Sequence, residues 1–193
     1  MHTDLYVSLA GYLLGLSLSA PPGPVNAIMM NESSKSALHG ASVGAGAMTA
    51  DAIFLAILYF VRSTIPHWIF EYLYILGAAY MLYLSVSVLK SKMPSRSQKG
   101  NYLVGISIGI TNPFQIVWWI TVGLFLIEKL TMISVLFFFL GIVTWITVFP
   151  LAVNRLGKEY AGLVKLLSFI VLVAFSALMI FYALESFLPF KLI

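Results

Sequence analysis

Long apolar runs follow one another along the whole chain, and only short polar segments separate them. The runs cover residues 5–30, 38–61, 68–89, 102–127, 130–153 and 161–188. A helix of about 20 apolar residues crosses the hydrocarbon core of a bilayer. Only 9% of the residues are charged, whereas soluble domains carry about 25%. The sequence therefore predicts an all-α integral membrane protein with six transmembrane helices, in which residues 1–193 form a single transmembrane domain.

The first run has a competing interpretation as a cleaved signal peptide, because Ser17–Ala20 (SLSA) resembles a cleavage site. However, no Lys or Arg precedes the run, and Pro21 would directly follow the cut. We therefore expect a membrane helix here.

The basic residues are unevenly divided between the polar segments. If the helices alternate in direction, one side of the membrane holds eight of the eleven Lys and Arg residues and the other side holds three. The positive-inside rule assigns the first side to the cytoplasm. The eight are Lys35, Lys90, Lys92, Arg96, Lys99, Arg155, Lys158 and Lys165, and the three are Arg62, Lys129 and Lys191. This predicts a multi-pass protein of the cell (plasma) membrane with both termini outside and a cytoplasmic basic loop, 90–101. The loop is better explained as a topology determinant than as a lipid or nucleic-acid patch, so we expect no nucleic-acid partner.

Two segments 90 residues apart are similar. Tyr12–Ser19 reads YLLGLSLS and Tyr102–Gly109 reads YLVGISIG, and each runs into a helix breaker. A weaker match aligns Gly46–Thr49 with Gly141–Thr144. Each half would hold three helices, and an odd number inserts the second copy in the opposite direction, as in many secondary transporters. We therefore expect two inverted repeats, 5–89 and 102–188, whose first helices are broken at proline motifs.

The two breaks are candidate binding elements. Proline lacks an N–H group and interrupts a helix, and a helix that restarts presents free N–H groups and a positive dipole end. Such an end suits a carboxylate, and the carbonyl groups before the break suit an ammonium group or a cation. A kink that serves only packing is the alternative, but matched breaks in a repeat favour a site. The candidate substrate-binding residues are Pro22, Gly23, Pro24, Asn26, Asn112, Pro113 and Gln115. Asn26 either lines the site or binds the freed backbone. Trp118 and Trp119 could each line a cavity or face lipid.

Asp51 lies near the centre of a helix that has no other charge. A carboxylate at the centre of a bilayer costs several kcal/mol, so it is expected to face the protein interior and to be functional. We predict that Asp51 takes part in proton or ion coupling; a structural hydrogen bond to the broken backbone is the alternative. Gly11, Gly15, Gly40, Gly44, Gly105 and Gly109 form G-x-x-x-G pairs, which are typical of closely packed membrane helices.

Several kinds of chemistry have no residues to support them. The chain has no cysteine, which excludes thiol redox chemistry and thiolate metal sites. His2, His39 and His67 are scattered, so we expect no metal site. No Ser/His or His/Glu pair lies at membrane depth, so we expect no enzyme and no cofactor. A membrane enzyme or redox carrier is the least favoured interpretation.

The motifs together resemble the LysE/RhtB family of amino-acid exporters. The resemblance rests on PPGPVN at 21–26, the glycine-rich second helix with Asp51, the basic loop, and Asn112-Pro113. It implies export of amino acids or small derivatives from the cytoplasm, with a proton or cation as coupling ion. The family's motif positions correspond to Pro22, Gly23, Pro24, Asp51, Asn112 and Pro113. Relatives often carry a lysine directly after the Asn-Pro pair, whereas this chain has Phe114 and then Gln115.

Two exporter hypotheses remain open. The first is a secondary exporter of amino acids, which works as a proton-coupled antiporter by alternating access in the lipid bilayer; a homodimer is left open. The second is an exporter of divalent metal cations or other small solutes, in which Asn26, Thr49, Asn112 and Thr144 would assist Asp51. The metal hypothesis predicts several hard oxygen ligands near the midplane. If the breaks form a site, we expect them to approach each other near the midplane across a pseudo-two-fold axis, with Asp51 close by.

Overall fold

The computed structural model describes residues 2–21, 23–90, 101–129, 132–156 and 161–187, and the regular structure in these ranges is helical. The first part of the chain contains α1 (His2–Ser19), α2 (Pro24–Ser33), α3 (Ala37–Val61), the 3₁₀ turn η1 (Arg62–Thr64) and α4 (His67–Lys90). The second part contains α5 (Tyr102–Thr111), α6 (Pro113–Trp118), the π-helical η2 (Trp119–Gly123), α7 (Leu124–Lys129), α8 (Met132–Leu156) and α9 (Ala161–Phe187). Pro22 and most of the basic loop lie outside the described residues.

The helices account for most of the predicted membrane crossings. Three stretches are each long and apolar enough to cross a bilayer: Ala37–Thr64, Trp68–Ser87 and Met132–Arg155. Two bent pairs qualify as further spans, which gives up to five among the described residues. The predicted sixth run coincides with α9, whose described apolar stretch is Phe169–Leu184. The described residues therefore agree with a helical protein that has three to five candidate membrane spans, and the sixth span stays a prediction.

Both predicted breaks are present. The chain bends by 80° between Leu5–Ser19 and Pro24–Ser33, and by 62° between Tyr102–Thr111 and Phe114–Lys129. Gly23 and Asn112 have extended backbones and precede Pro24 and Pro113, the first residues of α2 and α6. This follows from proline chemistry, because the residue before a proline avoids the helical region while proline itself fits the first position of a helix.

The polar segment 31–35, which we expected to be a loop, is partly helical. Helix α2 continues to Ser33, and the Glu32 side chain is only 2% exposed. The Nζ atom of Lys35 donates to both carboxylate oxygens of Glu32, at 2.7 and 2.8 Å. In addition, Asn154 Nδ2 donates to the carbonyl oxygen of Ser33 at 2.8 Å. These polar partners explain why the helix extends through charged sequence, since a buried carboxylate requires a paired cation or donors.

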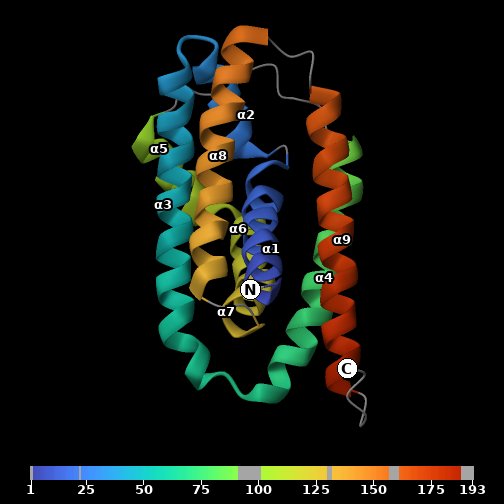
Figure 1. Ribbon diagram of the computed structural model, residues 1–193. Coiled ribbons are helices and arrows are strands. Elements are labelled where there is room, and N and C mark those ends of the chain that lie inside the picture. The colour runs from blue at the N-terminus through green and yellow to red at the C-terminus, as the bar shows by residue number, and fades with distance from the viewer. Residues whose placement is uncertain (1, 22, 91–100, 130–131, 157–160, 188–193) are drawn as a thin grey trace.

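The closest helix pairs join the two parts of the chain. Helix α1 packs along α8, α3 along α5, and α4 along α9, and Figure 1 shows α4 beside α9 on one side of the molecule. A Cβ atom added to Gly15 would lie against the Phe138 carbonyl oxygen and 3.3 Å from Gly141 Cα. The backbones of α1 and α8 therefore touch, as expected where small residues meet between membrane helices.

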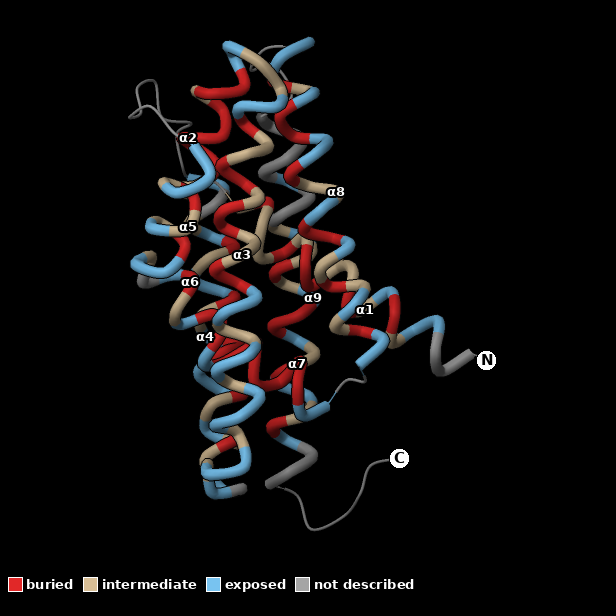
Figure 2. The backbone as a smooth tube through the Cα atoms, turned by 90° about the vertical axis from the view of Figure 1, so that its left-hand side faces the viewer, coloured by how far each residue is buried: buried red, intermediate tan, exposed pale blue. Residues whose placement is uncertain are grey.

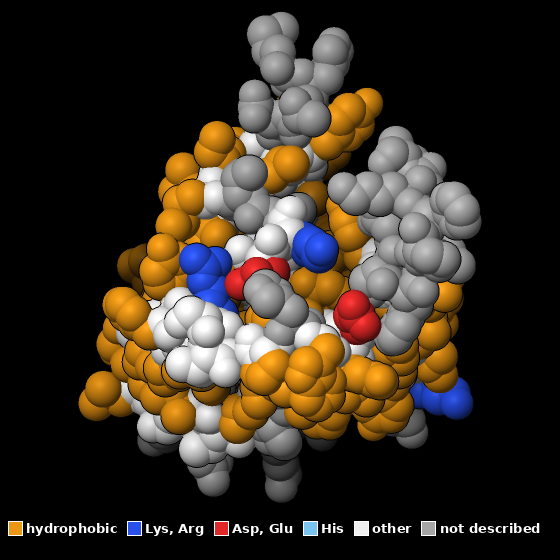
Figure 3. Space-filling model, turned by 90° about the horizontal axis from the view of Figure 1, so that it is seen from below, with side chains coloured by type: hydrophobic (Ala, Val, Ile, Leu, Met, Phe, Trp, Pro, Cys, Tyr) orange, Lys and Arg blue, Asp and Glu red, His pale blue; other side chains and the backbone are white. Residues whose placement is uncertain are grey.

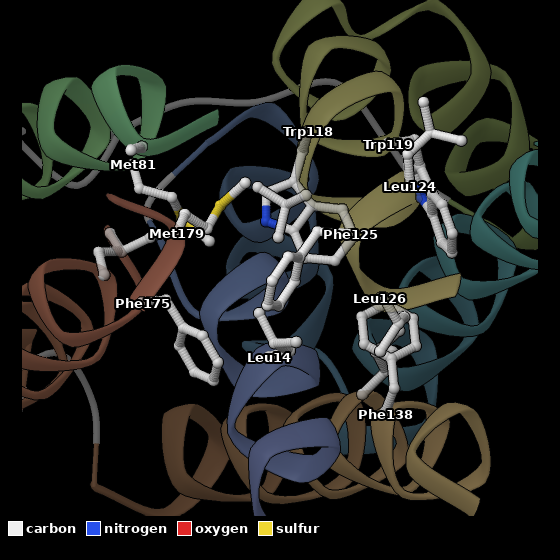
Figure 4. Packing of buried hydrophobic residues seen from close by; sticks show 14 of the residues in the cluster. Leu14, Met81, Trp118, Trp119, Leu124, Phe125, Leu126, Phe138, Phe175 and Met179 are labelled. Atoms are coloured by element: carbon white, nitrogen blue, oxygen red, sulfur yellow. The ribbon is translucent and has the colours of Figure 1, made fainter. Parts of the chain in front are cut away.

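The interior is rich in aromatic side chains. Trp118 packs against Trp119 and Phe138, with ring centroids 5.4 and 5.5 Å apart, and Figure 4 shows these rings between the helices. Figure 2 shows that α7 is mostly buried, while the outer helices have exposed turns. Large apolar side chains cover those turns; Leu103 and Leu136, for example, are 68% and 69% exposed. Such a surface fits contact with lipid.

The end of the molecule at which α3 meets α4 carries a small polar centre. Arg62 Nη1 lies 3.7 Å from Glu128 Oε1 and donates to the carbonyl oxygen of Ile127 at 3.3 Å. Figure 3 views this end and shows basic and acidic side chains gathered within a hydrophobic surround.

Candidate functional site

A cavity with a volume of about 230 Å³ lies between the two breaks. Five of the predicted site residues line it together with Asp51: Gly23, Pro24, Asn26, Asn112 and Gln115. Pro113 is not among the lining residues, and Pro22 lies outside the described residues. The expectation that the two breaks and Asp51 lie close together in space therefore agrees with the geometry.

Asp51 of α3 points into the protein and accepts two hydrogen bonds. Its side chain is buried. Gln115 Nε2 donates to Asp51 Oδ1 at 2.6 Å, and Trp119 Nε1 donates to the same oxygen at 2.8 Å. Asp51 thus joins the second break through side chains and not through freed backbone, which differs from the structural alternative considered above.

The Asn26 side chain provides hydrogen-bond partners for the backbone at the first break. Its Nδ2 atom donates to the carbonyl oxygens of Ser19 and Pro21, at 2.6 and 2.8 Å, and its Oδ1 accepts from Trp145 Nε1 at 3.0 Å. In a membrane, an unpaired carbonyl group costs several kcal/mol. The amide therefore replaces part of the backbone ladder that the prolines remove, and it does so while lining the cavity. Asn26 thus binds the freed backbone, and its role in a substrate site stays a prediction.

At the second break, the side chain of Asn112 caps the helix that follows. Asn112 Oδ1 accepts from the N–H of Phe114 at 3.1 Å and so caps α6. Tyr80 of α4 donates its hydroxyl hydrogen to the Phe114 carbonyl oxygen at 2.6 Å. At the first break, in contrast, the N-cap residue is Gly23, which offers no side-chain cap. The two breaks occupy matching positions in the sequence. They differ in that a side chain caps the helix after the second break but not the helix after the first.

Aromatic residues complete the cavity. Trp118 and Trp145 line it, as do Tyr80 and Tyr83 from α4. Trp118 was left undecided by the sequence, and Trp145, Tyr80 and Tyr83 were missed. The sequence gives little indication of these residues, because aromatic residues are common throughout this chain. Only the packing distinguishes those that face inward. Trp119, also undecided, is fully buried and binds Asp51.

The oxygen atoms that a metal site would need are largely engaged. Asn26 Oδ1 accepts from Trp145 and Asn112 Oδ1 caps α6. The Thr49 hydroxyl bonds to Tyr102 Oη at 2.8 Å, and the Thr144 hydroxyl donates to the carbonyl oxygen of Leu140 at 2.8 Å. Within the part of the chain that the structure describes, no group of three or more His, Cys, Asp or Glu side chains is placed to hold a metal ion.

Comparison with known proteins supports a transport role for this geometry. The family model described as LysE type translocator matches residues 16–188. "Putative amino acid efflux protein YcgF" of Bacillus subtilis (strain 168) is 34% identical over 127 residues, which make up 59% of this chain and 60% of that protein. The aligned region thus spans less than two thirds of that relative's length. No solved structure matches the chain.

Proposed function

The chain belongs to the LysE type translocator family, and on this premise we propose that it is a secondary active exporter of amino acids or small amino-acid derivatives. The observation that carries the proposal is the single cavity lined by both helix breaks and by Asp51. A midplane site between interrupted helices is where secondary transporters bind their substrates. The name of the relative YcgF, which refers to amino acid efflux, supports the same substrate class.

The packing supports two inverted repeats, 5–89 and 102–188. Residue Gly15 of α1 meets Gly141 of α8, and the equivalent residues Gly105 of α5 and Gly46 of α3 also meet: a Cβ atom on Gly105 would lie 3.1 Å from Gly46 Cα. The pairing of α1 with α8 thus has its counterpart in the pairing of α5 with α3, and α4 pairs with α9. This is the pattern that a pseudo-two-fold axis through the α4–α9 contact would produce.

The sidedness follows from charge. The positive-inside rule assigns the end with Lys35 and Arg155 to the cytoplasm and the end with Arg62 and Lys129 to the outside. The cavity reaches Ser87 of α4, close to the cytoplasmic end of that helix. Toward the outside, α7 is buried against the aromatic interior. We therefore assign this arrangement to a state in which the site is closed toward the outside. Alternating access requires such a state.

Asp51 is the group that we assign to proton or cation coupling. It is the single acidic residue among the described residues that line the cavity. Its two donors come from the second half of the chain, so a change in its charge would alter contacts between the halves. Proton coupling by this route needs no cofactor.

The test is transport by purified protein reconstituted into proteoliposomes. A panel of radiolabelled amino acids is offered with and without a pH gradient, and exchange against internal unlabelled substrate is measured in parallel. We expect exchange of at least one amino acid, and accumulation that depends on the gradient. Accumulation of divalent cations with no exchange of any amino acid would overturn the proposal in favour of the metal exporter.

A further inference from the structure

The helical stretches that restart after the two breaks form two arms, each with a bend at its first residue. The first arm is α2 and the second is α6–η2–α7, and each begins at a proline that follows an extended residue, Gly23 or Asn112. The second arm lines the cavity as far as Trp118 and continues to Lys129. Residues at the end of a helix commonly absorb the backbone changes of a hinge motion. A pivot at either break would therefore move the far end of its arm most.

At the end of the molecule with the turn between α3 and α4, one contact joins the far end of the second arm to the first half of the chain. Arg62, directly after α3, donates from Nη1 to the carbonyl oxygen of Ile127 at 3.3 Å and lies 3.7 Å from Glu128 Oε1. Its guanidinium also lies over the Tyr59 ring, 4.4 Å from the centroid. Figure 1 shows α7 toward this end of the molecule. Arg62, Ile127 and Glu128 make up the outer contact.

At the opposite end, a comparable contact joins the far end of the first arm to the second half. Asn154, in the last turn of α8, donates from Nδ2 to the carbonyl oxygen of Ser33 at 2.8 Å, and these two residues make up the inner contact. Helices α3 and α8 each contain 25 residues, and each contact takes its donor from the C-terminal end of one of them. In both contacts the acceptor is a backbone carbonyl oxygen in the last turn of an arm. The two contacts are thus related as inverted repeats would relate them.

Both contacts lie outside the substrate site and connect the two halves. Among the described residues that line the cavity, none belongs to either contact, so their effect falls on access to the cavity. Each holds an arm of one half against the long helix of the other half. Alternating access moves the halves relative to each other. Opening either end by such a motion therefore breaks the contact at that end.

We propose that the outer contact is the extracellular gate of this transporter and the inner contact is its cytoplasmic gate, and that transport releases them one at a time. This inference rests on the proposed function and adds the residues that control access to its site. Both contacts are made in this structure, which agrees with the outside-closed state assigned above.

The first test measures access to the cavity from each side. M48C places a thiol in the cavity lining, and the chain has no other cysteine. A small charged methanethiosulfonate is applied to whole cells, which present the outer end, and to inside-out vesicles, which present the inner end. Labelling is measured on the purified protein. R62A should raise the rate from the outside only, by about twofold to fivefold, the range that loss of a partly exposed ion pair allows. N154A should raise the rate from the inside only.

Matched controls lie beside each contact. Ser63 and Ser34 are exposed, and each hydroxyl bonds to a carbonyl oxygen within its own turn. S63A and S34A should therefore leave both rates unchanged. R62K keeps the charge and should fall between wild type and R62A. If R62A does not fold, E128Q removes only the charge of the partner and should also raise the rate from the outside.

The second test ties the outer contact shut. R62C/E128C is bridged with a bifunctional methanethiosulfonate, whose bonds a reductant cleaves, and exchange of the panel of radiolabelled amino acids is measured before and after reduction. Bridging should abolish exchange, and reduction should restore it. In the control Y59C/R62C the bridge joins positions three residues apart, with Cβ atoms about 5–6 Å from each other, and should leave exchange intact.

The outcomes separate this inference from the proposed function. Faster labelling from both sides in R62A and N154A would show a general loosening of the fold and overturn the inference. Exchange that continues in bridged R62C/E128C would also overturn it, and amino-acid export would stand in both cases. Absence of exchange for every amino acid in the wild-type protein would overturn the proposed function itself.

Discussion

Gln115 and Asp51 lie 64 residues apart in the sequence and are joined in the protein interior by a hydrogen bond of 2.6 Å between Nε2 and Oδ1. The bond connects α3 to the helix that restarts after the second break. Any rearrangement of α6 relative to α3 must change this bond, so the carboxyl group and the break are mechanically linked.

The variant D51N separates coupling from folding. An amide has nearly the size of the carboxyl group, and its oxygen can still accept from Gln115 and Trp119, but it cannot exchange a proton. We expect accumulation driven by a pH gradient to be lost while exchange of substrate continues. The check is transport by reconstituted protein with and without the gradient, and intact gradient-driven transport in D51N would remove Asp51 from coupling.

The two donors to Asp51 should act together. Q115L and W119F each remove one bond to a buried carboxyl group, and each should lower the free energy of unfolding by about 1–3 kcal/mol. The double variant leaves the carboxyl oxygen without either donor. We therefore expect its loss to exceed the sum of the single losses, measured by denaturation of the purified protein in detergent. Additivity within about 0.5 kcal/mol would show that the two donors are independent.

Asn26 should contribute more to stability than an ordinary buried asparagine. N26A leaves the carbonyl groups of Ser19 and Pro21 and the indole N–H of Trp145 without their partner, so the cost is a multiple of about 1–3 kcal/mol. N154A, which removes a single bond to Ser33, is the matched control and should cost clearly less. Thermal unfolding of both variants in detergent compares them.

We expect stability to require glycine where helices cross, as at Gly105, but not at Gly23. A Cβ atom on Gly105 would press on the Val43 carbonyl oxygen, a backbone atom that cannot move alone. Gly23 has φ near −151° and open space around it, since a Cβ atom added there would lie 3.9 Å from the Pro21 carbonyl oxygen. G105A should therefore lower the unfolding temperature strongly and G23A only slightly. Equal stability of the two variants would contradict close contact between α3 and α5.

The absence of cysteine from the sequence makes the orientation directly measurable. Ser34 and Ser63 are both exposed and lie in the turns after α2 and α3. In whole cells, a membrane-impermeant thiol reagent should label S63C and should label S34C only after the cells are opened. The reverse pattern would place both termini in the cytoplasm. Because this chain has no native thiol, any label found on the purified protein is on the introduced cysteine.

The sequence predicted the fold well where single residues impose strong constraints. Pro24 and Pro113 each mark the first residue of a restarted helix, because no other residue combines a missing N–H with a fixed φ. Asp51 was expected to face inward because lipid cannot solvate a carboxylate. Gln115 was predicted as a site residue from its position after the second break, and the structure adds that its partner is Asp51.

The partners of the buried tryptophans, the contact at Gly141 and the burial of Glu32 depend on tertiary packing, which no spacing pattern in the sequence predicts. Trp118, Trp119 and Trp145 are three of the four tryptophans, and nothing in their spacing distinguishes the donor to Asp51 from the donor to Asn26. Gly141 was not singled out as a packing residue because it has no glycine four positions away. Glu32 was taken for loop sequence, since its burial depends on Lys35 folding back over it.

The glycine contacts between the helices also determine the order in which this protein can be assembled. Each of the closest helix pairs takes one member from residues before the basic loop and one from residues after it. While the ribosome is still making α5 and α8, Gly15 of α1 and Gly46 of α3 lack the helices that they contact in the finished protein. The two halves of the chain are therefore not separate folding units. We expect the first half, made on its own, to insert unstably and to be degraded by membrane quality control.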